Sequence, residues 1–393
     1  MASIRKRGKG SFLLVAEGGY DAAGKRMQKT RTVKVPTRRD AEKELAKFVA
    51  EIEAGQYIAP QKMIFSAFIE EWKEKFVLKE LEFMTQKNYL YHTDRRILPY
   101  FGHMRLDQIK PMHIISFLDD LSKPGARNDG KEGGLGTSSI VYNYRVLQSI
   151  FSKAATEWKL IKVNPMENIK KPKEIKGEMK FYDEEELTAV FEALEDTDIQ
   201  FSMQITLAVT TGMRRAEMAG LEWQNVDLEK GYIKIVQSVP TFVEGKPLLK
   251  APKNKSSVRR VYLSPYVVDD LKAYQHHQRK IKFMMIDRWP DDGHDFVFTN
   301  NFGEPYHPQT LSKRWGRFLK NNPQIRPIRL HDLRHTTATI LISKNVHAKV
   351  IANRLGHANT KTTMNVYGHV VDSADIAAAG AFNDIVTKRK ANS

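Results

Sequence analysis

The feature that most constrains the fold is a stripe of apolar residues that recurs every three or four positions between residues 140 and 158. An α-helix has 3.6 residues per turn, so this spacing places the whole stripe on one helical face. Residues 65–76 carry a second stripe with a similar period. Because such faces are stable in water only when they pack together, we predict an all-α domain over residues 64–169. The stripes consist of Phe65, Phe68, Trp72 and Phe76, and of Ile140, Tyr144, Leu147, Phe151, Ala154 and Trp158.

The chain before this helical block has a β pattern. The segments "SFLLVAE" (11–17) and "KTRTVKV" (29–35) have the composition of strands, and the glycines between them suit a hairpin loop. Thr37 can then cap a helix, with Asp40 three residues further along. Residues 1–55 are therefore predicted to form a small α+β domain.

The chain after the helical block is predicted to form a third domain. Residues 170–180 combine lysines with proline and glycine, which is typical of an exposed basic linker. Residues 181–371 are mostly helical in pattern, with one small antiparallel sheet predicted between residues 231 and 264. Residues 372–393 have the apolar spacing of a tail helix too short to form a core alone. The expected fold class is multidomain and mainly α, with mixed α+β first and third domains.

The net charge indicates a polyanionic partner. The chain has 63 Lys and Arg residues against 46 Asp and Glu residues, a formal charge of +17. Residues 1–39 contain eleven basic and two acidic residues, and phosphates would relieve that self-repulsion. Nucleic acid is the first expectation, an anionic membrane surface the second, and a merely basic protein the alternative. The candidate DNA-binding residues are Arg5, Lys6, Arg7, Lys9, Lys29, Arg31 and Lys34, with Lys255 in the third domain.

The chain contains no cysteine. This excludes disulfides, thiolate catalysis and cysteine-ligated zinc. No apolar run approaches the roughly 20 residues that a membrane-spanning helix needs. The basic N-terminus also lacks the apolar stretch of a secretory signal. We therefore expect a soluble protein of a reducing compartment, without a membrane partner.

The first chemical motif is "TTGMRRAEMAGLEW" (210–223). Its pattern predicts a helix that ends at Gly212, with Arg214 at the following turn and Glu217 three residues later. A glutamate at this spacing can hold one side of a guanidinium and leave its other donors for a ligand. Arg–Glu pairs are also common on helix surfaces, so the motif carries little weight alone.

The second motif, "RLHDLRHTTAT" (329–339), places His331, Arg334 and His335 on one helical face. Two histidines four residues apart also match zinc-binding helices. The glutamate of that motif is absent here, however, and Arg334 would put a positive charge beside the metal. An arginine with neighbouring histidines suits a phosphate better.

Three further segments carry side chains that could act as acids, bases or nucleophiles. His357 follows Gly356 in "RLGHAN", where a turn between helices is predicted and helix capping is the alternative role. A lysine-rich segment before the second strand carries Lys253 and Lys255, a pattern also typical of a solvated turn. Tyr367 ends a short Thr-rich helix between polar neighbours, although a core position there would be apolar.

In this order the motifs resemble those of the tyrosine recombinase, or phage integrase, family. The resemblance rests on T-G-x-R-x-x-E, a hairpin lysine, H-x-x-R-H, L-G-H and the tyrosine of V-Y-G-H-V. It implies a catalytic domain over residues 181–371 and a core-type DNA-binding domain over residues 64–169. Residues 1–55 look like the arm-binding domain of integrases from temperate phages and conjugative transposons. The implied catalytic residues are Tyr367, Arg214, Lys253, His331, Arg334 and His357, with Glu217 and His335 in support and Lys255 as the alternative to Lys253.

The roles implied by the resemblance agree with phosphoryl-transfer chemistry. A phenol has a pKa near 10, so about one tyrosine in a thousand is ionised at pH 7, a handicap of roughly 4 kcal/mol. A proton acceptor such as His331 would lower that handicap for Tyr367. Arg214 and Arg334 would hold the scissile phosphate through bidentate contacts, and Lys253 would protonate the leaving oxygen. The family's 3′-phosphotyrosine link keeps the bond energy, so no ATP, metal or other cofactor is expected.

The leading expectation is a site-specific recombinase that integrates or excises a phage or mobile element. A type IB topoisomerase has similar chemistry, but relaxing supercoils does not require a second DNA-binding domain such as residues 1–55. A DNA-binding regulator without chemistry would not require Tyr367. The resemblance implies double-stranded DNA with core and arm sites, a homotetramer on DNA, a DNA-bending host factor and an excisionase as partners. It also implies that the tail packs on a neighbouring subunit, with its own subunit as the alternative, and that the protein is found in the bacterial cytoplasm, on the nucleoid when DNA is bound.

Overall fold

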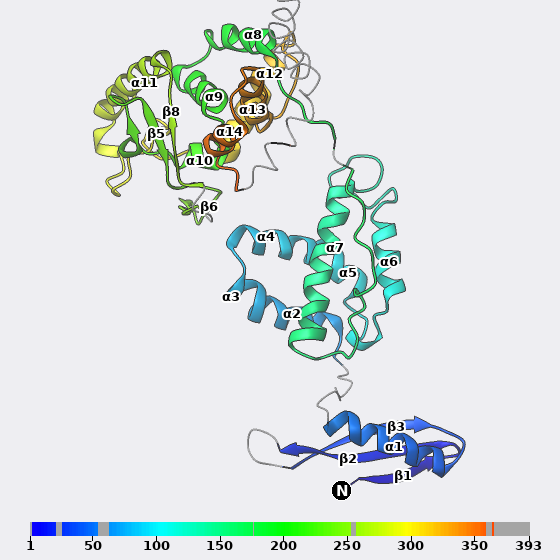
Figure 1. Ribbon diagram of the computed structural model, residues 1–393. Coiled ribbons are helices and arrows are strands. Elements are labelled where there is room, and N and C mark those ends of the chain that lie inside the picture. Colours follow the sequence, from blue (N-terminus) through cyan, green and yellow to red (C-terminus); the bar gives the residue numbers. More distant parts are fainter. Residues whose placement is uncertain are drawn as a thin grey trace, which may run out of the picture. The chain divides into compact units, whose positions relative to one another are not determined.

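The computed structural model describes residues 2–20, 26–53, 63–175, 177–252, 257–358 and 364 (Figure 1). Contacts divide the chain into two compact units, Met1–Lys176 and Gly177–Ser393. The predicted fold class is confirmed. The chain is multidomain and mainly helical, with a three-stranded antiparallel sheet near its N-terminus and small antiparallel sheets in the second unit. Within the described ranges, no helix combines the length and hydropathy that crossing a membrane requires.

The first unit begins with the antiparallel sheet β1-β2-β3, which packs on one helix. Strand β2 (Ser11–Tyr20) contains the first predicted strand, and β3 (Arg26–Lys34) contains the second except for Val35. Strand β1 (Ser3–Gly8) was not predicted, because its mostly charged, exposed side chains carry no apolar alternation. Helix α1 (Arg38–Glu53) begins at the predicted cap, where Thr37 Oγ1 accepts the Asp40 N–H at 3.1 Å. The core beneath the sheet consists of Phe12, Leu14, Ala16, Ala41 and Phe48.

The rest of the first unit is helical, as the two apolar stripes predict. Phe65, Phe68 and Trp72 of the first stripe are fully buried, and Phe68 meets the ring of Trp158 edge-on at 5.7 Å. Pro111 occupies the first turn of its helix, where its missing N–H costs nothing. The helices are α2 (Phe65–Trp72), α3 (Leu78–Glu80), α4 (Phe83–His92), α5 (Leu98–Phe101), α6 (Pro111–Asp120) and α7 (Thr137–Ser152), with π-helical turns at Lys73–Val77, Thr93–Ile97 and Lys153–Glu157.

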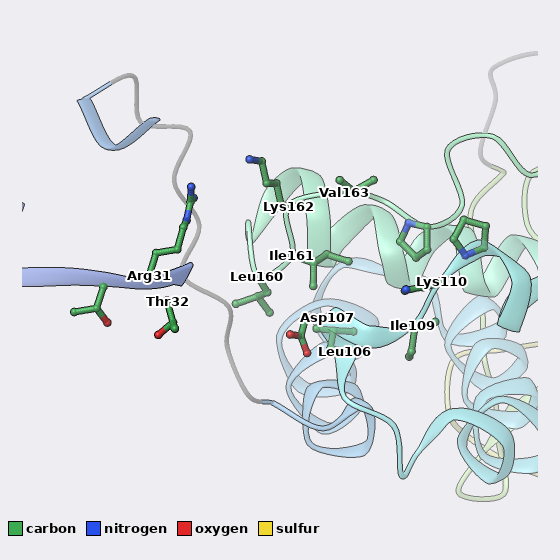
Figure 2. Close-up of a pocket in the computed structure, with 13 residues that line it drawn as sticks. Arg31, Thr32, Leu106, Asp107, Ile109, Lys110, Leu160, Ile161, Lys162 and Val163 are labelled. Carbon is green, nitrogen blue, oxygen red and sulfur yellow. The ribbon is translucent and has the colours of Figure 1, made fainter. Parts of the chain in front are cut away.

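One corner of this helical part is apolar at its centre and basic at its edge. Leu106, Ile109 and Ile161, which are labelled in Figure 2, are buried there. The exposed side chains of Lys110 and Lys162 lie beside them. At this corner the basic side chains therefore lie on the surface, whereas the aromatic stripe residues Phe65, Phe68 and Trp72 are buried in the core.

The second unit surrounds a small sheet with helices. Its helices are α8 (Glu184–Leu194), α9 (Ile199–Thr211), α10 (Arg215–Ala219), α11 (Pro265–Met284), α12 (Pro308–Asn321), α13 (Asp332–Ser343) and α14 (Ala348–Leu355). The sheet β4-β5-β8 consists of β4 (Val226–Asp227), β5 (Tyr232–Ile235) and β8 (Arg259–Tyr262), and the connection from β5 to β8 contains the hairpin β6 (Phe242–Val243) and β7 (Lys246–Pro247). Strands β5 and β8 pair with Ile235 opposite Arg259, in the region where the sequence predicts strands.

The start of the second unit is fastened to α13. Asp183 caps α8 through the predicted box, in which its carboxylate accepts the Glu186 N–H at 2.8 Å. The Tyr182 N–H donates to Thr336 Oγ1 at 3.1 Å, and the Tyr182 hydroxyl donates to the Arg326 carbonyl at 2.6 Å. The ring of Tyr182 is fully buried. The described residues of the predicted linker, 170–175 and 177–180, form neither helix nor strand before this anchor.

Candidate active site

The first predicted motif forms a tight turn between α9 and α10. Gly212 ends α9 in the left-handed conformation, with φ of 63°. A Cβ at this position would lie 2.3 Å from a methyl carbon of Leu355, so only glycine fits. Arg214 follows as the N-cap residue of α10. The predicted end of α9 is confirmed, and the turn places Arg214 at the edge of a cavity.

Glu217 holds Arg214 in place. Its carboxylate accepts the Arg214 N–H at 2.9 Å and the Arg214 Nη1–H at 2.7 Å. The Glu217 side chain is only 8% exposed, whereas that of Arg214 is 40% exposed. Neighbouring arginines keep the pKa of Glu217 below its usual value, although burial acts against them. Glu217 is therefore ionised and holds Arg214 in position, while part of the Arg214 guanidinium stays accessible to a ligand.

The second motif lies at the start of α13. His331 is the N-cap residue, and Arg334 and His335 lie in the first turn. Arg334 is buried, and its guanidinium donates to the carbonyls of Gly212 and Leu355, each at 2.5 Å. Burial lowers its pKa to about 9, with the Arg214 charge as a smaller cause. At pH 7 Arg334 therefore still carries a positive charge, within a largely dehydrated setting.

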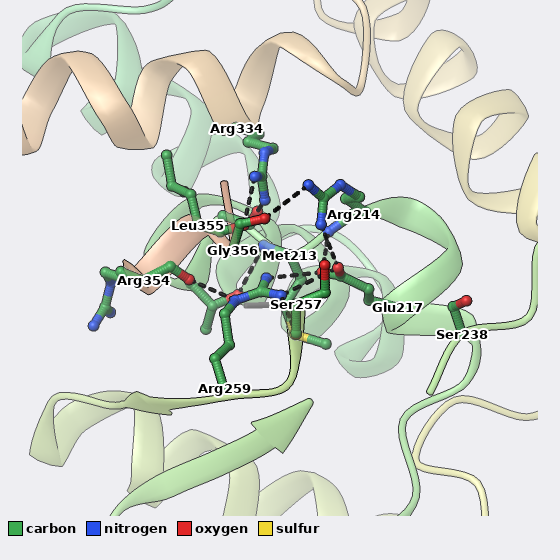
Figure 3. A network of polar contacts seen from close by, with 12 residues as sticks. Met213, Arg214, Glu217, Ser238, Ser257, Arg259, Arg334, Arg354, Leu355 and Gly356 are labelled. Carbon is green, nitrogen blue, oxygen red and sulfur yellow. Dashed lines mark hydrogen bonds and ion pairs between the residues drawn. The ribbon is translucent and has the colours of Figure 1, made fainter. Parts of the chain in front are cut away.

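Three arginines converge on the C-terminal end of α14 (Figure 3). Arg259 Nε, Arg334 Nη2 and Arg214 Nη2 donate to the consecutive carbonyls of Arg354, Leu355 and Gly356. The respective distances are 2.7, 2.5 and 3.2 Å. Helix C-terminal carbonyls lack partners within the helix and carry partial negative charge, so they suit cations. Side chains from β8, α13 and α10 are thereby fixed around one turn.

The histidines of this site are neutral at pH 7. Burial and the three nearby arginines lower the pKa of half-buried His357 to about 4. Desolvation, then the charges of His335 and Arg334, lower the pKa of His331. The rings of His331 and His335 meet edge-on with centroids 5.3 Å apart. An uncharged imidazole has a free nitrogen lone pair, so His331 has the protonation state that a proton acceptor requires.

Some of these side chains line a cavity of about 350 Å³. Arg214, His331 and Arg334 all contribute to its wall, together with Arg215 and Ser312. Guanidinium groups and a neutral imidazole around one cavity suit a phosphate group. Within the described residues, no cluster of three or more His, Asp or Glu side chains is arranged to hold a metal ion.

The remaining predicted site residues lie outside the described residues. Tyr367, Lys253 and Lys255 are among them, although residues on both sides of the two lysines are described. The start of α10, the start of α13 and the end of α14 thus bring together six of the predicted residues: Arg214, Glu217, His331, Arg334, His335 and His357.

Arg259 lies outside the motifs that the sequence presents. It is one of two adjacent arginines in "SVRRVYLS", and strand alternation shows only that one of the two faces inward. In the structure Arg259 is buried and Arg260 is exposed. The other predicted basic residues with described side chains are on the first sheet, where Arg31 is paired with Glu51 at 2.5 Å.

Comparison with protein families and with known sequences supports the resemblance seen in the motifs. Residues 180–374 match the Phage integrase family, and residues 64–122 match the N-terminal SAM-like domain of phage integrases. The ICEBs1 integrase of Bacillus subtilis (strain 168) is 26% identical over 388 residues, which is 98% of this chain and the whole of that protein. The integrase of Staphylococcus phage L54a is 25% identical and covers 80% of this chain and 90% of its own length.

Two solved structures share the fold. The integrase of transposon Tn1549, in complex with transposon right-end DNA, superposes with a TM-score of 0.65. It is 17% identical, and the match covers 78% of this chain and 95% of that one. The λ integrase tetramer bound to a Holliday junction matches with a TM-score of 0.56 at 18% identity, over 92% and 94% of the two chains. At these identities the likeness establishes the fold alone.

Proposed function

Because this chain belongs to the phage integrase family of tyrosine recombinases, we propose that it integrates and excises a phage or conjugative element through a covalent 3′-phosphotyrosine intermediate. The proposed substrate is double-stranded DNA with core and arm sites, bound by a homotetramer. Residues 181–371 would carry the chemistry, residues 64–169 would bind the core site and residues 1–55 the arm site. DNA-bending and directionality factors are the proposed accessory partners.

The proposed cleavage step uses the cavity described above. The Tyr367 oxygen attacks the phosphorus, its proton passes to His331, and the bond from phosphorus to the 5′-oxygen breaks. Lys253, or Lys255 in its place, gives the departing oxygen a proton. The products are a 3′-phosphotyrosine and a 5′-hydroxyl. Attack of a 5′-hydroxyl from the partner strand reverses the step and joins the strands, so no net bond energy is required.

One observation carries this proposal: Arg214 and Arg334 are fixed around the same turn while both line the same cavity. Negative charge develops on the non-bridging oxygens as phosphorus is attacked. Guanidinium groups that are already oriented stabilise that charge without reorganising at the moment of reaction. An arrangement needed only for binding DNA would not require a buried guanidinium, that of Arg334, in the wall of a cavity.

A suicide substrate tests the proposal. A core-site duplex with a nick close to the cleavage position loses its short 5′-hydroxyl fragment after cleavage, so the covalent complex accumulates. We expect a protein–DNA adduct that resists denaturation and forms equally well in the presence of EDTA. If bound DNA gives no adduct, or if EDTA abolishes adduct formation, the proposed mechanism is wrong.

The open face of the first sheet is the proposed arm-site surface. Strand register places Arg5 opposite Leu13 and Lys34 opposite Ser11. These residues face away from α1, because Phe12 and Leu14, their neighbours in β2, point into the core. Arg31 is on the α1 side, where it stacks over Phe48 at 4.6 Å. An exposed sheet face can enter a DNA groove, so Arg5 and Lys34 are better placed than Arg31 to reach phosphates.

Charge removal on this face should weaken binding to the arm site. Arg5→Gln and Lys34→Gln should each reduce the slope of log affinity against log salt concentration by about 0.9, the value for one lost phosphate contact. Fluorescence anisotropy with an arm-site duplex at several salt concentrations measures that slope. The matched control is Lys47→Gln, because Lys47 is exposed on α1 and pairs with Glu44. Equal slopes for all three variants would rule out this face.

A further inference from the structure

We infer that Arg259 is a positioning residue for strand cleavage, acting on Arg214 through Glu217 and on the His357 turn through the end of α14. The inference rests on the proposed function. It adds a third arginine to the site, one that holds the others in place without itself lining the cavity formed by Arg214, His331 and Arg334.

The first support is the shared carboxylate. Arg259 Nη2 contacts Glu217 Oε2 at 2.8 Å, and Arg259 Nη1 contacts Oε1 at 3.2 Å. Glu217 uses the same two oxygens for the backbone and side chain of Arg214. Because each carboxylate oxygen accepts hydrogen bonds from both Arg214 and Arg259, the carboxylate cannot rotate without breaking several of them. The direction of Arg214 is therefore set by a residue 45 positions away in the sequence.

The second support is the contact with the end of α14. Arg259 Nε donates to the Arg354 carbonyl at 2.7 Å, next to the carbonyls that Arg334 and Arg214 use. A Cβ on Gly356 would lie 2.7 Å from Arg259 Nη1, and Gly356 has a φ of 66°. The guanidinium therefore lies directly against the turn that precedes His357. A side chain at position 356 would therefore push the two elements apart.

The third support is the position of Arg259 in the chain. It begins β8 and follows residues 253–256, which carry the two candidate lysines. Its Nη1 also donates to the Ser257 carbonyl at 3.2 Å. One side chain thus bonds Ser257, which directly follows the lysine segment, the helix start that presents Arg214 and the end of α14 before His357. The side chain is 5% exposed, so bulk water does not compete strongly for these bonds.

A double-mutant cycle tests whether Arg259 acts through Arg214. The variants are Arg259→Gln, Arg214→Lys and the two combined, measured as single-turnover adduct formation at saturating suicide substrate. Arg259→Gln alone should slow cleavage roughly ten- to a hundredfold, which is the order expected when a reacting group is displaced by about 1 Å. In the Arg214→Lys background the same change should cost clearly less, because the part of its effect that passes through Arg214 has already been lost.

Three further measurements separate positioning from folding. Arg259→Lys, which keeps the charge but not the paired donors, should retain more activity than Arg259→Gln. Arg260→Gln, on the exposed side of the same strand, should cleave like the natural protein. Thermal unfolding and DNA affinity of each variant show whether a rate loss reflects a lost fold. Equal rate losses in both Arg214 backgrounds, or no loss at all, would overturn the inference. Absence of an adduct with the natural protein would instead refute the proposed function.

Discussion

Tyr367→Phe is expected to bind core-site DNA with unchanged affinity and to form no covalent adduct. The substitution removes one oxygen atom and keeps the ring, so packing and charge hardly change. The proposed step forms a bond between that oxygen and phosphorus, and phenylalanine has no atom that can replace it. Gel-shift titration measures affinity, and denaturing electrophoresis with the nicked duplex measures the adduct. No residual cleavage is expected, which makes this the largest effect proposed for the protein.

The matched control for this change is Tyr266→Phe. Tyr266 is 84% exposed on α11, and it too is a phenol with no assigned role. It should form adduct at the rate of the natural protein. Peptide mapping of the natural adduct should place the DNA fragment on the peptide that contains residue 367. Adduct formation by Tyr367→Phe, or an adduct mapped to another peptide, would show that the nucleophile is assigned wrongly.

Arg334→Lys should slow cleavage on the order of a hundred- to a thousandfold, while DNA binding changes little. Lysine keeps the positive charge but cannot donate to Gly212, to Leu355 and to a phosphate at once, because its donors radiate from one nitrogen. Losing one oriented donor to a developing oxyanion typically has an effect of this size. Single-turnover cleavage at saturating DNA measures it without a contribution from affinity.

The same change should also lower stability, because a buried carbonyl left without a partner costs about 1–3 kcal/mol. Chemical denaturation reports that cost separately from the rate. Arg317→Lys is the control, since Arg317 is exposed on α12 and the change there keeps the same chemistry. If Arg334→Lys cleaved at the natural rate, Arg334 would hold the fold together without stabilising the transition state.

The candidate site was predictable where its residues are close in sequence. Glycine at the end of α9, the spacing of Arg214 and Glu217 and the cluster at the start of α13 are local patterns. The pairing of Glu217 with Arg259 is not local, because 42 residues and a change from helix to strand separate the two. Two adjacent arginines in a strand differ in burial only through the register of the sheet. That register becomes visible in the structure, where Arg259 lies opposite Ile235.

The fold was predictable to a similar extent. Apolar stripes identified the helical part of the first unit, because an amphipathic face leaves a strong periodic signal. Strand β1 leaves none, since its side chains are mostly charged and exposed and its pairing with β2 comes from backbone hydrogen bonds. His331 was predicted within a helix and instead occupies the N-cap position, a difference of one position at a helix end.

The anchor at Tyr182 has a mechanical consequence. Its backbone N–H is bonded to Thr336, two residues along α13 from Arg334. A force that pulls on the chain before Tyr182 would therefore act on α13, whose first turn contains the buried guanidinium of Arg334. Less than one helical turn separates the point where this segment is attached, Thr336, from Arg334.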